Sequence, residues 1–138
     1  MAVEGYAFST RQEIVLRDLD SFGHVNNAVY LTFIENARID YLRNVVGAAR
    51  RDEIRNIMAA VSLEFRAEVP FEDELEIGVR TVGIGTKSFQ LSYRLVRKDG
   101  VVAVDATSTQ VMFDFDAGIA IEVPEDWRRA IEAHDGLP

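Results

Sequence analysis

The sequence predicts an α+β fold in which an antiparallel five-stranded sheet wraps around one long central helix, with a short helix at the C-terminus. One long segment in the first half of the chain has helical periodicity and is apolar on most of its sides, so we expect sheet to cover it on more than one side. One strand-like run precedes this segment and four follow it. An antiparallel sheet around a single helix accommodates that order.

The N-terminal part of the chain contains the first strand, a polar loop and the long helix. The strand is predicted at residues 8–17 by alternation around Ile14 and Leu16. The loop follows at residues 18–27, and the helix at residues 27–46, with Gly47 as a stop signal. Two apolar stripes run along this helix, the first made by Tyr30, Phe33, Ile34, Ala37 and Tyr41, the second by Ala28, Leu31, Ile39 and Leu42.

The remaining elements follow a charged connection at residues 48–56. Lys98-Asp99-Gly100 is typical of a hairpin turn, and Pro124 suits the start of a helix. Alternation and β-branched residues predict four strands and one helix, at residues 57–68, 74–82, 88–97 and 101–115 for the strands and 124–133 for the helix.

Length and composition limit the possible functions. The 138 residues fit a single domain spanning residues 1–138. The net charge of −8 argues against nucleic-acid binding, although a few basic residues can still hold an anionic ligand. The absence of cysteine excludes disulfides and a cysteine nucleophile. No run is long enough for a membrane-spanning helix, and the N-terminus lacks signal-peptide features, so we expect a cytoplasmic protein without a membrane partner.

The polar loop and the start of the helix carry a specific motif. It comprises Asp18-Leu19-Asp20, Gly23-His24-Val25-Asn26-Asn27, Tyr30, Glu35 and Ala37-Arg38. Over Ile14 to Leu42 this stretch resembles the acyl-thioesterase signature of the hotdog fold, and is similar to the 4-hydroxybenzoyl-CoA thioesterase-like enzymes and the plant acyl-(acyl carrier protein) thioesterases. The resemblance implies hydrolysis of an acyl-CoA or acyl-ACP thioester without a cofactor. It also implies a homodimer, or a dimer of dimers, which closes the open sheet edge.

Asp20 is the first candidate for the chemistry. A carboxylate can activate water or attack the acyl carbon, and unpaired N–H groups in the first helical turn can stabilise the developing oxyanion. In the resembling enzymes the second acidic residue of the D-x-D motif is catalytic, which matches Asp20, and the backbone amide at the position of Asn27 polarises the thioester. Asp18 is interpreted as a turn former.

His24 and Glu35 each have two interpretations. His24 matches a histidine proposed to be catalytic in the plant-type branch, but the 4-hydroxybenzoyl-CoA branch works without it, so His24 could instead shape the loop. Glu35 lies on an apolar stripe and should be at least partly buried. It could pair with Arg38 three residues later, or serve as a second carboxylate at the acyl pocket, as the plant-type branch suggests.

Other positions are candidates for substrate binding. Gly23 should supply a backbone conformation that side chains disfavour, Asn26 should cap the helix, and Val25 lies between His24 and Asn26 in the motif. Lys87 and Ser88 lie in a region that, in related dimers, borders the neighbouring subunit's substrate channel. Phosphate contacts are also conceivable at three further basic residues, Arg66, Arg97 and Lys98.

Two other functions remain as alternatives to hydrolysis. The first is a hotdog hydratase or dehydratase acting on enoyl thioesters, although the chain lacks the Asn-Pro spacing of that branch. The second is a non-catalytic acyl-CoA-binding module, because fold does not fix function. A metal site built from Asp18, Asp20 and His24 has weak support, since no second ligand cluster accompanies them, and none is expected.

Overall fold

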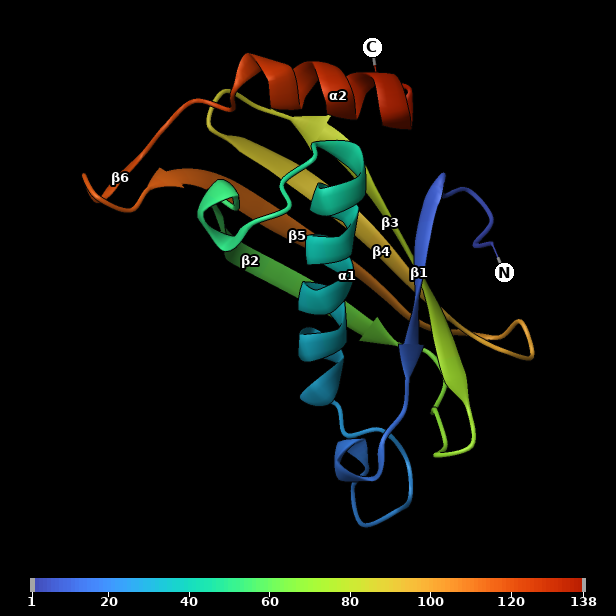
Figure 1. The fold of residues 1–138 in the computed structure, drawn as a ribbon. Helices are drawn as coiled ribbons and strands as arrows, with labels where there is room; N and C mark the ends of the chain where they lie inside the picture. The colour runs from blue at the N-terminus through green and yellow to red at the C-terminus, as the bar shows by residue number, and fades with distance from the viewer. Residues whose placement is uncertain (1, 138) are drawn as a thin grey trace.

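A curved antiparallel sheet wraps around helix α1 (Val29–Val45) in the computed structural model, which describes residues 2–137 (Figure 1). The spatial order of the strands is β1-β3-β4-β5-β2, and β6 pairs with β5. The strands are β1 (Phe8–Glu13), β2 (Asn56–Phe65), β3 (Glu74–Ile84), β4 (Ser88–Arg97), β5 (Val102–Asp114) and β6 (Ile119–Ala120), and the chain closes with α2 (Glu125–Asp135). The predicted antiparallel sheet around one long helix is therefore confirmed.

The structure differs from the predicted boundaries at a few places. The first strand ends at Glu13, and a 3-10 turn (Leu16–Asp18) replaces its last residues. The physical reason is local, because the Asp18 carboxylate accepts a hydrogen bond from the Val15 N–H at 2.8 Å and draws the chain into a turn. Similarly, Arg51–Glu53 forms a 3-10 turn inside the charged connection. The two-residue strand β6 was not predicted, since so short a segment shows no alternation.

The core lies between the concave face of the sheet and the first apolar stripe of α1. Every member of that stripe is buried. The helix packs chiefly against β1 and β3. Alternate residues of β4, Phe89, Leu91, Tyr93 and Leu95, are fully buried beneath it. The second stripe is less covered: Leu42 is buried, Leu31 and Ile39 are half-buried, and Ala28 is exposed.

A network of buried polar side chains, connected by hydrogen bonds, lies on the part of the sheet toward β2. The amide of Gln110 donates to Ser108 at 2.9 Å and accepts from Asn56 at 2.8 Å and from Arg38 at 2.7 Å. Ser108 in turn shares a hydrogen bond with Tyr93 at 2.7 Å. Burial raises the pKa of the Tyr93 phenol to about 12. Two buried polar atoms of this network, Arg38 Nε and Asn56 Oδ1, have no hydrogen-bond partner among the described residues.

The sheet has two edges of different character. Strand β1 is short and polar, with the sequence FSTRQE. Strand β2 has the sequence NIMAAVSLEF and pairs on one side only, with β5. Ile57, Val61 and Phe65 leave more than a third of their surface exposed along it. An unpaired apolar edge of this length is a surface that soluble proteins normally cover.

Helix α2 is held by a buried carboxylate at its C-terminal end. Asp135 accepts hydrogen bonds from the Thr81 N–H at 3.0 Å and from the Tyr41 hydroxyl. His134 Nδ1 lies 2.9 Å from the same carboxylate. Burial, together with the bond to Asp135, raises the pKa of Tyr41 above its usual range. These contacts connect α2, α1 and β3 near the C-terminal end of α1.

Candidate functional site

The loop that carries the motif is built by a small antiparallel pairing of its own. Leu19 pairs with Val25, and His24 pairs with Pro70. The Asp20 N–H donates to the His24 carbonyl at 2.9 Å, and the Asn26 N–H donates to the Asp18 carbonyl at 2.8 Å. Gly23 turns the loop with a φ of 81°, a value that confirms the expected need for glycine. Backbone hydrogen bonds thus fix the conformation of the loop.

Asp20 is half-buried, and its two carboxylate oxygens have different surroundings. Oδ1 accepts hydrogen bonds from the Phe22 N–H at 2.9 Å and, more weakly, from the His24 N–H at 3.4 Å. Among the described residues, nothing donates to Oδ2. Backbone amides therefore fix the orientation of the carboxylate, while one oxygen stays available for a reacting molecule.

The start of α1 presents a free backbone donor near this carboxylate. Asn26 accepts from the Ala28 N–H through its side chain and from the Val29 N–H through its carbonyl, both at 2.9 Å. Asn26 thus holds the turn that leads into the helix. The N-cap position is Ala28, which makes no side-chain cap bond, so the prediction that Asn26 caps the helix is wrong. Between these bonded groups, the Asn27 N–H has no acceptor in residues 2–137. An unpaired N–H at a helix N-terminus is a suitable donor to a developing oxyanion.

Tyr30 belongs to the site, although the sequence placed it in the core stripe. Its ring lies 5.5 Å from that of Phe65, and both line a hollow of about 290 Å³ together with Val25 and Asn27. Burial, and secondarily the negative charge of Asp20, raise the pKa of Tyr30 to about 12. The phenol is therefore close enough to Asp20 to sense its charge. The sequence motif includes Tyr30, but no role beyond the core stripe was predicted for this residue.

The side chain of His24 lies at the rim of the same hollow. Its Nδ1 is 3.4 Å from a carboxylate oxygen of Glu68, in the segment between β2 and β3. Its backbone pairs with Pro70 in that segment. The structure thus brings His24 and Asp20 together through the backbone, with the imidazole directed toward Glu68.

Glu35 is exposed in the protomer, so the expectation of partial burial is wrong for the single chain. It makes no ion pair with Arg38 among the described residues, because Arg38 turns toward Gln110 instead. The sequence argument assumed sheet on both sides of α1, whereas the helix packs chiefly on β1 and β3. The charge of Glu35 contributes to the raised pKa of the Tyr93 phenol on β4.

Lys87 and Ser88 lie away from Asp20 in one protomer, whereas Arg66 lines the hollow beside Tyr30. Lys87 is exposed and Ser88 begins β4, beside Met112 near the end of β5. The loop of Asp20 instead adjoins Pro70, near the start of β3. The three further basic candidates have protein partners: Arg66 with Glu64 and Asp105, Arg97 with Asp73 and Asp99, and Lys98 with the Glu72 carbonyl.

Within residues 2–137 no group of three histidine or acidic side chains is arranged to hold a metal ion. In the same part of the chain, no helix has both the length and the apolarity needed to cross a membrane.

Comparison with known proteins agrees with this geometry. Residues 14–131 match the family model of the thioesterase-like superfamily. The long-chain acyl-CoA thioesterase FadM of Escherichia coli is 30% identical over 117 residues, covering 83% of this chain and 89% of its own. A Thermus thermophilus thioesterase solved with coenzyme A and zinc is 31% identical, with a TM-score of 0.86 and 99% coverage of both chains.

A 4-hydroxybenzoyl-CoA thioesterase solved with 4-hydroxybenzoyl-CoA is 20% identical, with a TM-score of 0.81 over 90% of this chain and 97% of its own. That likeness concerns the fold, and it confirms the hotdog architecture. Since the family model spans most of the chain, the protein belongs to the thioesterase-like superfamily.

Proposed function

We propose that this protein hydrolyses acyl-CoA thioesters to a free acid and coenzyme A, with Asp20 as the reacting carboxylate. The observation that carries the proposal is that one carboxylate oxygen of Asp20 and the N–H of Asn27 at the start of α1 both lack a protein partner within residues 2–137. A carboxylate and an oxyanion donor are the two groups that thioester hydrolysis requires. Membership of the thioesterase-like superfamily supports the reaction type. The similarity to FadM supports CoA as the carrier of the acyl group.

The reaction can be written with these groups alone. Asp20 accepts a proton from a water molecule, whose oxygen attacks the thioester carbon while the Asn27 N–H donates to the carbonyl oxygen. Collapse of the tetrahedral intermediate breaks the carbon–sulfur bond, and the proton held by Asp20 returns to the departing thiolate. The Tyr30 phenol, whose pKa is raised to about 12, remains protonated throughout at neutral pH and can donate a hydrogen bond beside Asp20.

His24 is proposed to position this loop. Its interactions with Glu68 and Pro70 connect the loop to the segment between β2 and β3, so that the Asp20 backbone keeps its place relative to Asn27.

We further propose that the protein acts as a homodimer formed through β2. The strand has an unpaired edge and exposed apolar side chains at Ile57, Val61 and Phe65. Phe65 lies next to Tyr30 at the hollow of the site. A second copy paired along β2 would therefore border the site as well as cover the edge.

The reaction is tested with a panel of acyl-CoA substrates of increasing chain length, with release of free thiol as the readout. Hydrolysis of at least one substrate by purified protein is expected, and absence of thiol release across the panel would refute the proposal. A single turnover in ¹⁸O-labelled water distinguishes the two routes open to a carboxylate. Direct attack of water leaves Asp20 unlabelled, whereas a covalent anhydride followed by water attack at the Asp20 carbonyl would introduce the label into the protein.

A further inference from the structure

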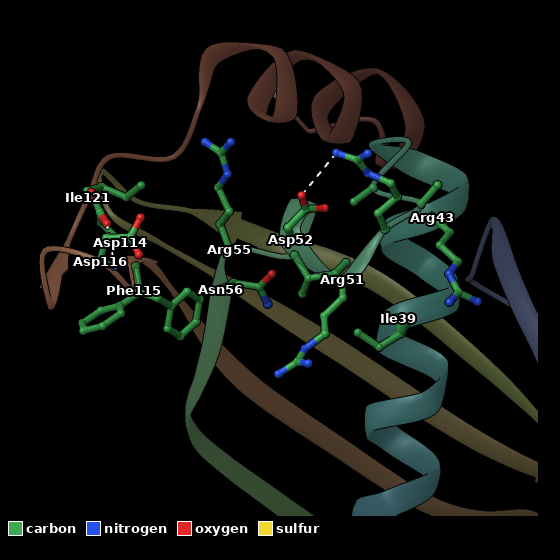
Figure 2. Close-up of a pocket in the computed structure, with 15 residues that line it drawn as sticks. Ile39, Arg43, Arg51, Asp52, Arg55, Asn56, Asp114, Phe115, Asp116 and Ile121 are labelled. Carbon is green, nitrogen blue, oxygen red and sulfur yellow. Dashed lines mark hydrogen bonds and ion pairs between the residues drawn. The ribbon is translucent and has the colours of Figure 1, made fainter.

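A large cavity in the described part of the chain lies at the other end of the protomer from Asp20. Its volume is about 1120 Å³, and it opens between the C-terminal half of α1, the 3-10 turn Arg51–Glu53, the start of β2 and the β5–β6 hairpin (Figure 2). The reaction proposed above uses no residue of this cavity. Its lining combines arginines, aromatic rings and one buried amide.

The positive charge in this cavity is only partly neutralised by the protein. Arg50 pairs with Asp52 at 3.2 Å and with Glu53 at 3.3 Å, and Arg43 lies 3.9 Å from Asp40. Arg51 and Arg55 have no carboxylate partner among the described residues. The side chains of Arg51 and Arg55 point in different directions (Figure 2). The two guanidinium groups would therefore contact separated anionic groups of a ligand.

The acidic residues of the lining are otherwise engaged or peripheral. Asp52 is the partner of Arg50. Asp114 accepts from the N–H groups of Asp116 and Ala117 and thereby forms the β5–β6 turn, and Asp116 is exposed in that turn.

A buried amide gives the cavity a second, independent polar feature. Asn56 is 5% exposed and lines the cavity. Its side-chain nitrogen donates to Gln110 at 2.8 Å, but its oxygen has no donor within residues 2–137. A buried acceptor without a partner costs about 1–3 kcal/mol, a cost that a ligand N–H or O–H would remove.

The aromatic part of the lining suits a flat ring. Phe113 and Phe115 form an edge-to-face pair with centroids 5.4 Å apart, and Phe115 is 61% exposed. Exposed aromatic rings next to basic residues are the combination on which nucleobases stack while their phosphates are paired. An adenosine carrying phosphates offers all three features: a stacking ring, an amino group that donates, and separated negative charges.

Pairing of β2 with its copy would place this cavity beside the hollow at the start of α1 in the other protomer. Within one protomer, Asn56 lines the cavity at one end of β2, and Phe65 at the other end lines the hollow next to Tyr30 and Asn27. The ten-residue strand separates them by about 30 Å at about 3.3 Å per residue. A two-fold axis runs the two copies of β2 antiparallel, so Phe65 of one chain lies near Asn56 of the partner subunit.

We propose that Arg51 and Arg55 of one protomer bind the phosphorylated adenosine end of the acyl-CoA whose thioester lies at Asp20 of the other protomer. This inference rests on the proposed function, and makes each site a product of both chains. It also distinguishes the substrate carriers, because a short thioester without the nucleotide would not reach the arginines.

The first test compares two thioesters of one acyl chain, one carried by coenzyme A and one by N-acetylcysteamine, which lacks the nucleotide. Arg51→Ala/Arg55→Ala should raise KM for the CoA thioester about 10- to 100-fold, since charge-assisted hydrogen bonds to phosphate are lost. KM for the short thioester should stay within about twofold. Arg11→Ala, on the opposite edge strand β1, removes one exposed arginine and should leave both values unchanged. An unchanged KM for the CoA thioester, or equal changes for both, would overturn the inference.

The second test mixes subunits. In a heterodimer of Asp20→Asn and Arg51→Ala/Arg55→Ala chains, one site regains both Asp20 and the arginines, so hydrolysis with the wild-type KM should return. If the arginines serve the Asp20 of their own chain, no site is complete and the low-KM activity stays absent, which refutes the arrangement across the dimer.

The third test does not depend on hydrolysis. Adenosine 3′,5′-bisphosphate should bind wild-type protein in calorimetry, and the double arginine variant should lose that binding. A chain that binds the bisphosphate in this way but hydrolyses no thioester would refute the proposed function and leave the nucleotide site standing. Arginine-dependent binding with an unaffected KM for acyl-CoA would assign the cavity to a separate nucleotide and overturn its role in substrate binding.

Discussion

Replacing Asp20 with asparagine should separate catalysis from folding. The asparagine carbonyl can still accept from the Phe22 and His24 N–H groups, and the amide nitrogen replaces Oδ2, which has no protein partner. We therefore expect the free energy of unfolding to change by less than about 1 kcal/mol. Loss of a positioned base should lower kcat by about 100- to 10,000-fold, and a 100-fold loss corresponds to about 2.7 kcal/mol in the barrier.

The assay is thiol release from the best acyl-CoA substrate, with thermal melting measured on the same sample. Asp18→Asn is the matched control, because Asp18 is a buried loop carboxylate whose Oδ2 accepts from the Val15 N–H and does not face the site. An asparagine oxygen can take over that bond, so turnover should stay within about threefold of wild type. A folded Asp20→Asn protein with near wild-type kcat would refute the assignment.

Three further changes test other parts of the structure. Val61→Lys in the middle of β2 should convert the dimer to a monomer in light scattering and abolish turnover. The control Thr107→Lys, on the exposed face of β5, should change neither the oligomeric state nor turnover. A dimeric, active Val61→Lys protein would contradict the β2 interface. Glu35→Gln should keep the melting temperature, since the side chain is exposed in the protomer, and lower kcat by about 10- to 100-fold, as expected of a second carboxylate at the acyl pocket; wild-type kcat would remove Glu35 from the site. Asp135→Ala should cost about 1–3 kcal/mol of stability in denaturant unfolding by leaving the Thr81 N–H unpaired, while the Tyr41 hydroxyl keeps its bond to Thr81 Oγ1. A loss below about 0.5 kcal/mol would show that water replaces the carboxylate.

Much of the fold follows from patterns that a single sequence carries. Strand β4 has the predicted bounds, because buried and half-buried residues alternate along almost its whole length. The first stripe of α1 is buried as expected. The end of β1 was missed because a side-chain hydrogen bond from Asp18 decides it, and such bonds leave no periodic signal. The register of β3 against β4 shifts between Thr81 and Gly83, at a glycine inside the strand, which is where bulges are common.

The site was less predictable than the fold. Motif residues near each other in sequence could be assigned to one loop, and the free Asn27 N–H was expected from its place at the helix start. Tyr30 is part of the motif, but its place at the hollow beside Phe65 and Asn27 became apparent only in the structure. Arg51 and Arg55 lie in a segment that the sequence marks only as charged, and their possible role depends on how β2 meets another chain.

The spatial order of the strands differs from the order in which the ribosome produces them. Strand β2 at Asn56–Phe65 has one partner in the protomer, β5 at Val102–Asp114, so both edges of β2 stay unpaired in a growing chain until nearly all of it has been made. Pairings this distant in sequence are slow to form, and an unpaired apolar strand is where incomplete chains aggregate. Translation speed between Phe65 and Val102, and the chaperones available in that interval, should therefore influence the yield of folded protein more than changes at its surface.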